Sequence, residues 1–183
     1  MLRHLPLLLT LLSLAGCGSS GGYRLAATTL PGLDVAFAGG SWDGERVPQS
    51  GICSNFGGKD ISPSLVVGNI PEGANAILVQ FNDLDHPPLS RHGGHGTIGF
   101  WIKGGGQAHL PPVTGYSVEM PDGAFIERPA LSSGAFASQG YLAPCSGGKG
   151  HRYVADVLAV YKATDSTDDS QILAEQRFEL GRY

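Results

Sequence analysis

The sequence has few charged residues, few cysteines and no long apolar stretch. Only 15% of its 183 residues are charged, the net charge is −4, and there are three cysteines. It lacks the clustered basic residues that a nucleic-acid-binding face requires, so nucleic acid is not expected as a partner. The apolar run from Leu5 to Leu14 is too short for a membrane-spanning helix. No internal repeat or shift in composition marks a second domain.

Motifs of several enzyme classes are absent as well. The chain contains neither the His-Glu-x-x-His pattern of zinc peptidases nor the Gly-x-Ser-x-Gly pattern of serine hydrolases. The glycine-rich segment near residue 147 is not a Walker phosphate loop, because Ala143 replaces its early glycine and Gly150 its Ser or Thr. We therefore expect a binding module rather than an enzyme, without a cofactor or a bound metal.

Glycine and proline, in contrast, are abundant. The 28 glycines and 12 prolines predict many turns and few long helices. Short apolar runs lie between these turns, and we interpret them as strands over residues 33–37, 76–81, 98–102, 152–163 and 175–180. The fold class that follows is mainly β: an antiparallel β-sandwich with short peripheral helices and long loops.

The sequence pattern predicts the secondary structure of some segments more specifically than that of others. Residues 76–81 are nearly all apolar, which predicts a central strand buried on both faces. Residues 152–163 fit a strand or a helix, and their valines and tyrosines favour a strand. Residues 165–176 have the pattern of one short helix, and residues 103–139 that of long connections over one end of the sandwich.

The N-terminus has the pattern of a secretory signal over residues 1–16: a basic start, an apolar run and then small residues. The junction Leu14-Ala15-Gly16-Cys17 resembles the lipobox of bacterial lipoproteins. That resemblance implies that Cys17 becomes the N-terminus and carries acyl chains such as palmitate. A plain signal peptide with an incidental cysteine is the alternative.

This interpretation divides the chain into three parts. Residues 1–16 are removed, residues 17–32 form a lipidated N-terminus and flexible tether, and residues 33–183 form the folded domain. The domain is expected outside the cytoplasm, anchored to the inner or the outer membrane of a bacterial cell. The other two cysteines, Cys53 and Cys145, form a disulfide in an exported protein or remain two buried thiols.

The densest group of acids and bases follows the apolar run that ends at Phe81. Asp83 and Asp85 are two residues apart, and an extended backbone would point both carboxylates to the same side. His95 precedes the next strand, so it lies at that strand's mouth, where it can pair with a carboxylate. The alternative is that Asp83 and Asp85 only cap the turn after the strand.

A second group lies in a glycine-rich loop before residues 152–163. It carries Lys149 and ends at His151, directly before the long strand. Backbone N–H groups of such a loop can form a concavity that binds anions. Together the two groups predict one site at the point where strand ends converge.

Four motifs in the correct order resemble the phosphatidylethanolamine-binding proteins (PEBP), also called Raf kinase inhibitor-like proteins, most closely their bacterial branch. The motifs are CSNFGGKDISPSL at 53–65, DLDHP at 83–87 with GH at 94–95, APCSG at 143–147 and KGHRYV at 149–154. The C-terminal ILAEQRFELGRY is similar to the closing strand of that branch. The chain departs from the family at Leu84, at His86 and at Gly94, where an aromatic residue usually stands, so we expect a pocket of altered shape.

The resemblance implies a β-sandwich with a small anion pocket at one end. The residues that it assigns to ligand binding are Asp83, Asp85, Pro87, His95, Pro144, His151 and Tyr153. The predicted function is that of a lipid-anchored binding or regulatory protein for a small phosphorylated or carboxylated ligand. The alternatives are a metal-dependent hydrolase that uses the Asp/His cluster and a protein inhibitor of an exported protease.

Overall fold

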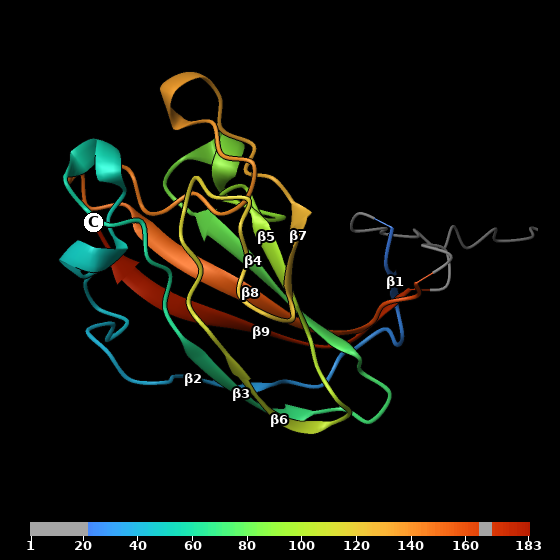
Figure 1. Ribbon diagram of the computed structural model, residues 1–183. Helices are drawn as coiled ribbons and strands as arrows, with labels where there is room; N and C mark the ends of the chain where they lie inside the picture. Colours follow the sequence, from blue (N-terminus) through green and yellow to red (C-terminus); the bar gives the residue numbers. More distant parts are fainter. Residues whose placement is uncertain (1–21, 165–169) are drawn as a thin grey trace, which may run out of the picture.

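The computed structural model describes residues 22–164 and 170–183 and has two unequal β-sheets that pack face to face (Figure 1). The mainly β class is therefore confirmed, although six strands against three make a lopsided sandwich. The larger sheet has the order β1-β9-β8-β4-β5-β7 and the smaller the order β2-β3-β6. The strands are β1 (Arg24–Leu25), β2 (Asp34–Phe37), β3 (Leu65–Ile70), β4 (Ala76–Asp83), β5 (Thr97–Trp101), β6 (Gly106–Leu110), β7 (Ala124–Arg128), β8 (Arg152–Tyr161) and β9 (Gln171–Arg182).

Strand β4 lies in the middle of the larger sheet, as its apolar sequence predicts. It pairs antiparallel with β5 on one side and with β8 on the other. Its side chains alternate: Ile77 and Val79 enter the core between the sheets, and Ala76 and Leu78 join a second apolar cluster. Burial on both faces is the reason that the strand shows a continuous apolar run rather than a polar–apolar alternation.

The segment around residue 171 corrects one prediction. Residues 171–176, expected in a short helix, begin strand β9, and the proposed helix start at 165–169 lies outside the described residues. The prediction rested on local capping signals. Pairing with all of β8 overrides them, because it buries Ile172 and Ala174 in the two apolar clusters. The same pairing makes residues 152–161 a strand, as the valines favoured.

Four strands were missed. β6 and β7 lie within residues 103–139, which we predicted as long connections, and neither β3 nor the two-residue β1 was predicted. β6 and β7 each end a sheet and are only partly buried, so their sequences lack a clear alternation. The expected short helices are 3-10 turns of three residues in the described chain. They are η1 (Gln49–Gly51), η2 (Ser54–Phe56), η3 (Pro87–Leu89) and η4 (Gly134–Phe136).

The start of the described chain packs on the larger sheet. Arg24 and Leu25 form β1, which pairs with β9 in parallel, the exception in an otherwise antiparallel sheet. Tyr23 is buried, and its hydroxyl donates to Glu127 and accepts from Lys162. Part of the segment expected as a tether thus belongs to the folded domain, whereas Cys17 lies outside the described residues.

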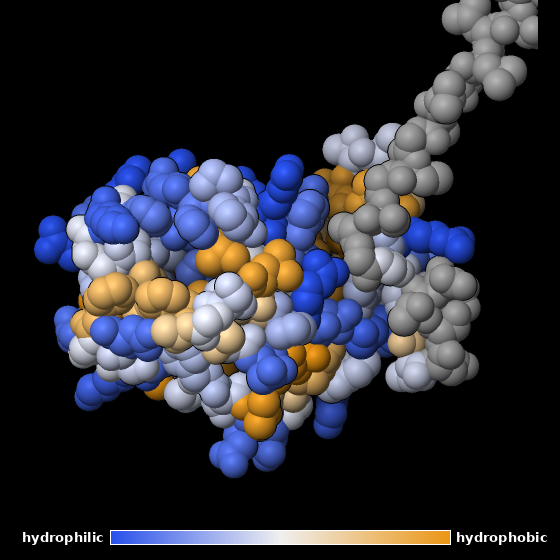
Figure 2. Space-filling model, turned by 90° about the horizontal axis from the view of Figure 1, so that it is seen from above, coloured by the Kyte–Doolittle hydropathy of each residue, from blue (hydrophilic) through white to orange (hydrophobic). Residues whose placement is uncertain are grey.

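The face that Figure 2 shows is mostly polar, with separate apolar patches. Large apolar side chains that remain exposed include Leu25, Phe56, Trp101, Phe136 and Tyr161. Within residues 22–164 and 170–183, no helix is long and apolar enough to cross a membrane.

Cys53 and Cys145 form a disulfide, which decides between the two alternatives left by the sequence. Their Cα atoms are 5.3 Å apart, and the bond closes a loop of 92 residues. It ties the turn before η2 to the segment that precedes β8. The amide of Cys53 also donates to the carbonyl of Pro144, so the two segments are joined by the backbone as well.

Loss of this disulfide should destabilise the domain. A loop of this length makes removal of the bond cost about 2–5 kcal/mol. Denaturant unfolding of the Cys53→Ala/Cys145→Ala variant should show that loss. A reducing agent should lower the unfolding midpoint of the wild type and leave the variant unchanged; equal stability of both proteins would contradict the prediction.

Candidate functional site

Three strand ends meet at one end of the larger sheet. Asp83 is the last residue of β4, His151 directly precedes β8, and His95 lies two residues before β5. Because β4 runs antiparallel to both neighbours, its C-terminal end lies beside the N-terminal ends of β5 and β8. The convergence that the sequence predicts for these three residues is therefore a direct product of the strand order.

The three side chains line one cavity of about 510 Å3. The other residues that line it come from three connections, between β2 and β3, β4 and β5, and β7 and β8: Phe56, His86, Pro88, Leu89, Leu131, Ser132, Ser133, Phe136, Leu142, Cys145, Ser146 and Lys149. The lining thus combines three histidines, one lysine, one carboxylate and several hydroxyls with an apolar and aromatic rim.

Asp83 and His151 form the closest pair in the cavity. The Nδ1–H group of His151 donates to Oδ2 of Asp83 across 2.7 Å, although the residues are 68 positions apart. The other carboxylate oxygen, Oδ1, accepts the amide of Asp85 at 3.0 Å. Both oxygens of the buried carboxylate are thus used, and the ring is held with Nε2 as its free nitrogen.

His95 is held differently. Its Nδ1 lies 2.9 Å from the carbonyl oxygen of Leu142, so Nδ1 carries a proton and donates it. The ring is buried and packs edge-on against Tyr153, with centroids 5.5 Å apart. Burial lowers the pKa of His95, which keeps the ring neutral near pH 7. Its Nε2 is buried and has no hydrogen-bond partner among the described residues.

The remaining predicted site residues do not line the cavity. Asp85 accepts the backbone amide of Arg152 at 2.7 Å, which fixes the start of β8. The Tyr153 hydroxyl accepts the amide of Cys145 at 3.2 Å, and burial raises the pKa of Tyr153. Pro87 begins η3, and Pro144 precedes the disulfide; neither lines the cavity.

Sequence reasoning missed the aromatic rim. Phe56 in η2 and Phe136 in η4 stack with ring centroids 6.5 Å apart, and both are exposed. Phe136 lies within residues 103–139, which we expected to form long connections over one end of the sandwich. His86 also lines the cavity. For Phe56 and Phe136, the available signal was an aromatic residue in an otherwise polar, glycine-rich loop.

The unusual Gly94 has a steric explanation. A Cβ atom at this position would lie 2.3 Å from the backbone of Leu89, so no aromatic side chain fits there. Leu89 itself lines the cavity at this point. The backbone of η3 at Leu89 thus occupies the space that a side chain at position 94 would need.

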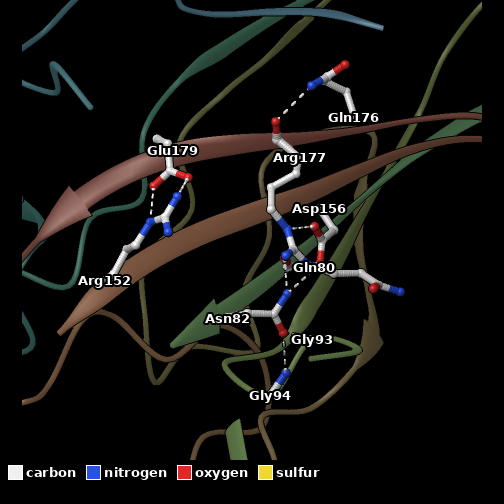
Figure 3. Close-up of polar contacts among 9 residues, drawn as sticks. All are labelled: Gln80, Asn82, Gly93, Gly94, Arg152, Asp156, Gln176, Arg177 and Glu179. Atoms are coloured by element: carbon white, nitrogen blue, oxygen red, sulfur yellow. Dashed lines mark hydrogen bonds and ion pairs between the residues drawn. The ribbon is translucent and has the colours of Figure 1, made fainter. Parts of the chain in front are cut away.

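The turn that carries His95 is supported from the outer face of the sheet. Asn82 accepts the amides of Gly93 and Gly94 at 3.0 and 3.1 Å, and its own amide donates to Asp156 at 3.0 Å (Figure 3). Asn82 is buried, so these bonds are shielded from water. Asn82 is therefore a positioning residue for His95.

A second cavity, of about 580 Å3, lies on this outer face between β1, β4, β8 and β9. Two of its charged side chains pair with each other: Arg177 binds Asp156 at 2.7 and 3.0 Å, and near it Arg152 binds Glu179 (Figure 3). No buried polar atom of the described residues is left free to bind a ligand there. We therefore assign the candidate site to the cavity of Asp83, His95 and His151.

Comparison with known proteins finds distant likenesses. No family model matches the chain. A UPF0098 protein of Archaeoglobus fulgidus is 25% identical over 120 residues, which are 64% of this chain and 37% of the relative's length. YbcL of Escherichia coli, called a new member of the mammalian PEBP family, has 23% identity and a TM-score of 0.48 over 80% of this chain and 98% of its own. CT736 of Chlamydia trachomatis, a PEBP homologue, has 21% identity and a TM-score of 0.43 over 83% of this chain and 97% of its own.

The buried neutral ring of His95 should make stability depend on pH. Below about pH 6.5 the ring binds a proton in the unfolded chain but not in the folded one, so stability falls as pH falls, by up to about 1.4 kcal/mol per pH unit. The His95→Gln variant, whose amide can still donate to Leu142, should lack this part of the loss. Urea unfolding of both proteins at pH 7.5, 6.5 and 5.5 measures the difference; parallel curves would refute the assignment.

Proposed function

We propose that the protein is a PEBP-like binding protein whose cavity takes a small ligand with a phosphate or carboxylate group, and that it catalyses no reaction. The observation that carries the proposal is the Asp83–His151 pair in the same cavity as the unpartnered Nε2 of His95. The motif order supports the PEBP-like assignment, because the second and the fourth of the four motifs supply these residues.

An anion would bind between the two rings. His151 donates from Nε2–H when its ring carries a second proton, and Lys149 adds a cation from the glycine-rich loop. Hydroxyls of Ser132, Ser133 and Ser146 line the same cavity and supply further donors. These groups match the three acceptor oxygens of a phosphate monoester.

His95 would accept a hydrogen bond from the ligand. While neutral, its Nε2 accepts a hydrogen bond, from a ligand hydroxyl, a protonated phosphate or an ammonium group. Asp83 is a poor partner for an ammonium, because both of its oxygens already accept from His151 and Asp85. A zwitterionic head group would thus place its anion at His151 and its donor at His95.

The alternatives receive less support. Among the described residues, no three His, Cys, Asp or Glu side chains gather as a metal site. His92, which lies between His86 and His95 in the sequence, lines the cavity on the outer face of the sheet instead. No feature of the described surface favours a protease inhibitor over a binding protein.

The lipid anchor is the second part of the proposal. Its support is the lipobox-like Leu14-Ala15-Gly16-Cys17 after a short apolar run. The disulfide of Cys53 with Cys145 suits a protein that matures in an oxidising compartment. Cys17 would then carry the acyl chains and hold the domain at a bacterial membrane.

Phosphate binding should depend on His151. Loss of a hydrogen bond to a charged group costs about 1.5–3 kcal/mol, so His151→Ala should bind inorganic phosphate or phosphoethanolamine about 10- to 100-fold more weakly. Isothermal titration calorimetry measures the affinity. His109→Ala, on β6 in the other sheet, is the matched control and should bind as the wild type does. Equal affinity of all three proteins, or no binding at millimolar ligand, would overturn the proposed site.

Membrane attachment should depend on Cys17. In bacterial cells that express the full chain, Cys17→Ser should move from the membrane fraction to the soluble exported fraction and lose incorporation of labelled palmitate. Ser19→Ala, two residues away, should remain membrane-bound and labelled. Membrane attachment of Cys17→Ser would show that the lipid anchor is not what holds the protein.

A further inference from the structure

Strands β4, β5 and β8 have the polar cavity residues at one end and exposed aromatic residues at the other. The cavity residues Asp83, His95 and His151 lie at one end. At the other end, β5 finishes at Trp101 opposite Ala76, and β8 finishes at Tyr161 opposite Gln171. Trp101 and Tyr161 are both exposed, whereas the interior residues of β5 and β8 are largely buried.

The described chain begins at this same end. β1 pairs with the first residues of β9, Arg24 with Gln171 and Leu25 with Ile172, and Leu25 is half exposed. Figure 1 shows β1 at the opposite side of the molecule from the arrowhead of β4, where the cavity lies. In Figure 2 apolar residues lie on the surface beside the start of the described chain. We call Leu25, Trp101 and Tyr161 the distal apolar end.

We propose that the distal apolar end rests on the membrane that holds the lipid anchor, so that the ligand cavity faces away from that membrane. The inference depends on the proposed lipidation of Cys17. Six residue steps lead from Cys17 to the buried Tyr23, so this stretch spans about 20 Å at most. The anchor point is therefore near the end of the sheet that carries Trp101, Tyr161 and Leu25.

The reach of the chain excludes the inverted orientation. Ten residue steps of β8 separate Tyr161 from His151, about 30 Å along the strand. If the cavity faced the membrane, Tyr23 would stand about that far above it, beyond the roughly 20 Å that the N-terminal stretch can span. The N-terminal stretch is long enough for a domain that is tilted or lies on its side. The exposed apolar side chains of the distal apolar end favour membrane contact through that end.

The chemistry of the distal apolar end fits a lipid interface. Tryptophan and tyrosine are the residues that prefer the boundary between water and acyl chains. The exposed charges nearby have both signs, with Arg24 and Lys103 against Asp122. Binding should therefore come from the aromatic residues and the anchor, and should depend little on salt or on anionic lipid.

The orientation also restricts the ligand. A cavity that opens about 30 Å from the membrane surface is out of reach of the head groups of that membrane. The phosphate or carboxylate that it binds would therefore belong to a free small molecule or to a facing surface.

Tryptophan fluorescence tests the orientation. The chain has two tryptophans, the buried Trp42 at 8% exposure and Trp101 at 44%. The full lipidated protein is reconstituted in phosphatidylcholine vesicles that contain brominated lipid, which quenches only rings at the interface. We expect clear quenching of the wild type and at least a threefold smaller effect in Trp101→Phe, which retains Trp42. The substitution replaces one exposed aromatic residue with another, so folding should be preserved.

A fluorescent probe at the cavity rim tests whether the cavity faces away from the membrane. A fluorophore on Ser133→Cys, an exposed position on the cavity rim, should not be quenched by the same lipid. Co-sedimentation with the vesicles is measured in parallel. If the protein co-sediments but Trp101 is not quenched, or the rim probe is, the orientation is wrong while the anchor stands. If the lipidated protein does not co-sediment, the proposed anchor fails, and the orientation fails with it.

Discussion

The register between β4 and β8 is the constraint on which the site depends. Asp83 lies opposite Tyr153 in that register, with His151 two residues before Tyr153, and the inward direction of the Asp83 side chain is set by the alternation of Ile77, Val79 and Phe81. A slip of one residue would turn the carboxylate to the outer face of the sheet and break the contact with His151. The apolar residues prevent such a slip, because it would also expose every core side chain of the strand. The hydrophobic core and the polar site are thus specified by the same pairing.

This dependence explains why a carboxylate is tolerated in a buried position. Burial of a charge is costly unless the charge is paired and hydrogen-bonded. Asp83 meets both conditions through the ring of His151 and the amide of Asp85. Asn82, the neighbour of Asp83, serves the opposite face, where its amide group holds the turn before His95. Two consecutive residues of one strand therefore fix two histidines from two sides of the sheet.

Local sequence was informative where burial dominates and uninformative where long-range pairing decides. The apolar run of β4 indicated a central strand, and polar residues at its end indicated a site, because both follow from local pattern. The helix expected over 165–176 was wrong for residues 171–176, since pairing with β8 outweighs local capping signals. The parallel pairing of β1 with β9 and the short edge strands β6 and β7 have no comparable local signature. Within the site, the roles of Gly94 and of the Phe56–Phe136 rim depend on contacts between distant loops, which spacing alone does not reveal.

Cys145 takes part in two structures at once. Its sulfur closes the bond to Cys53, and its amide holds the hydroxyl of Tyr153, whose ring packs against His95. The disulfide and this hydrogen bond therefore hold the same side of the cavity. Chain made in a reducing cytosol would lack the covalent half of that support, so preparations from different cellular compartments should not be treated as equivalent material.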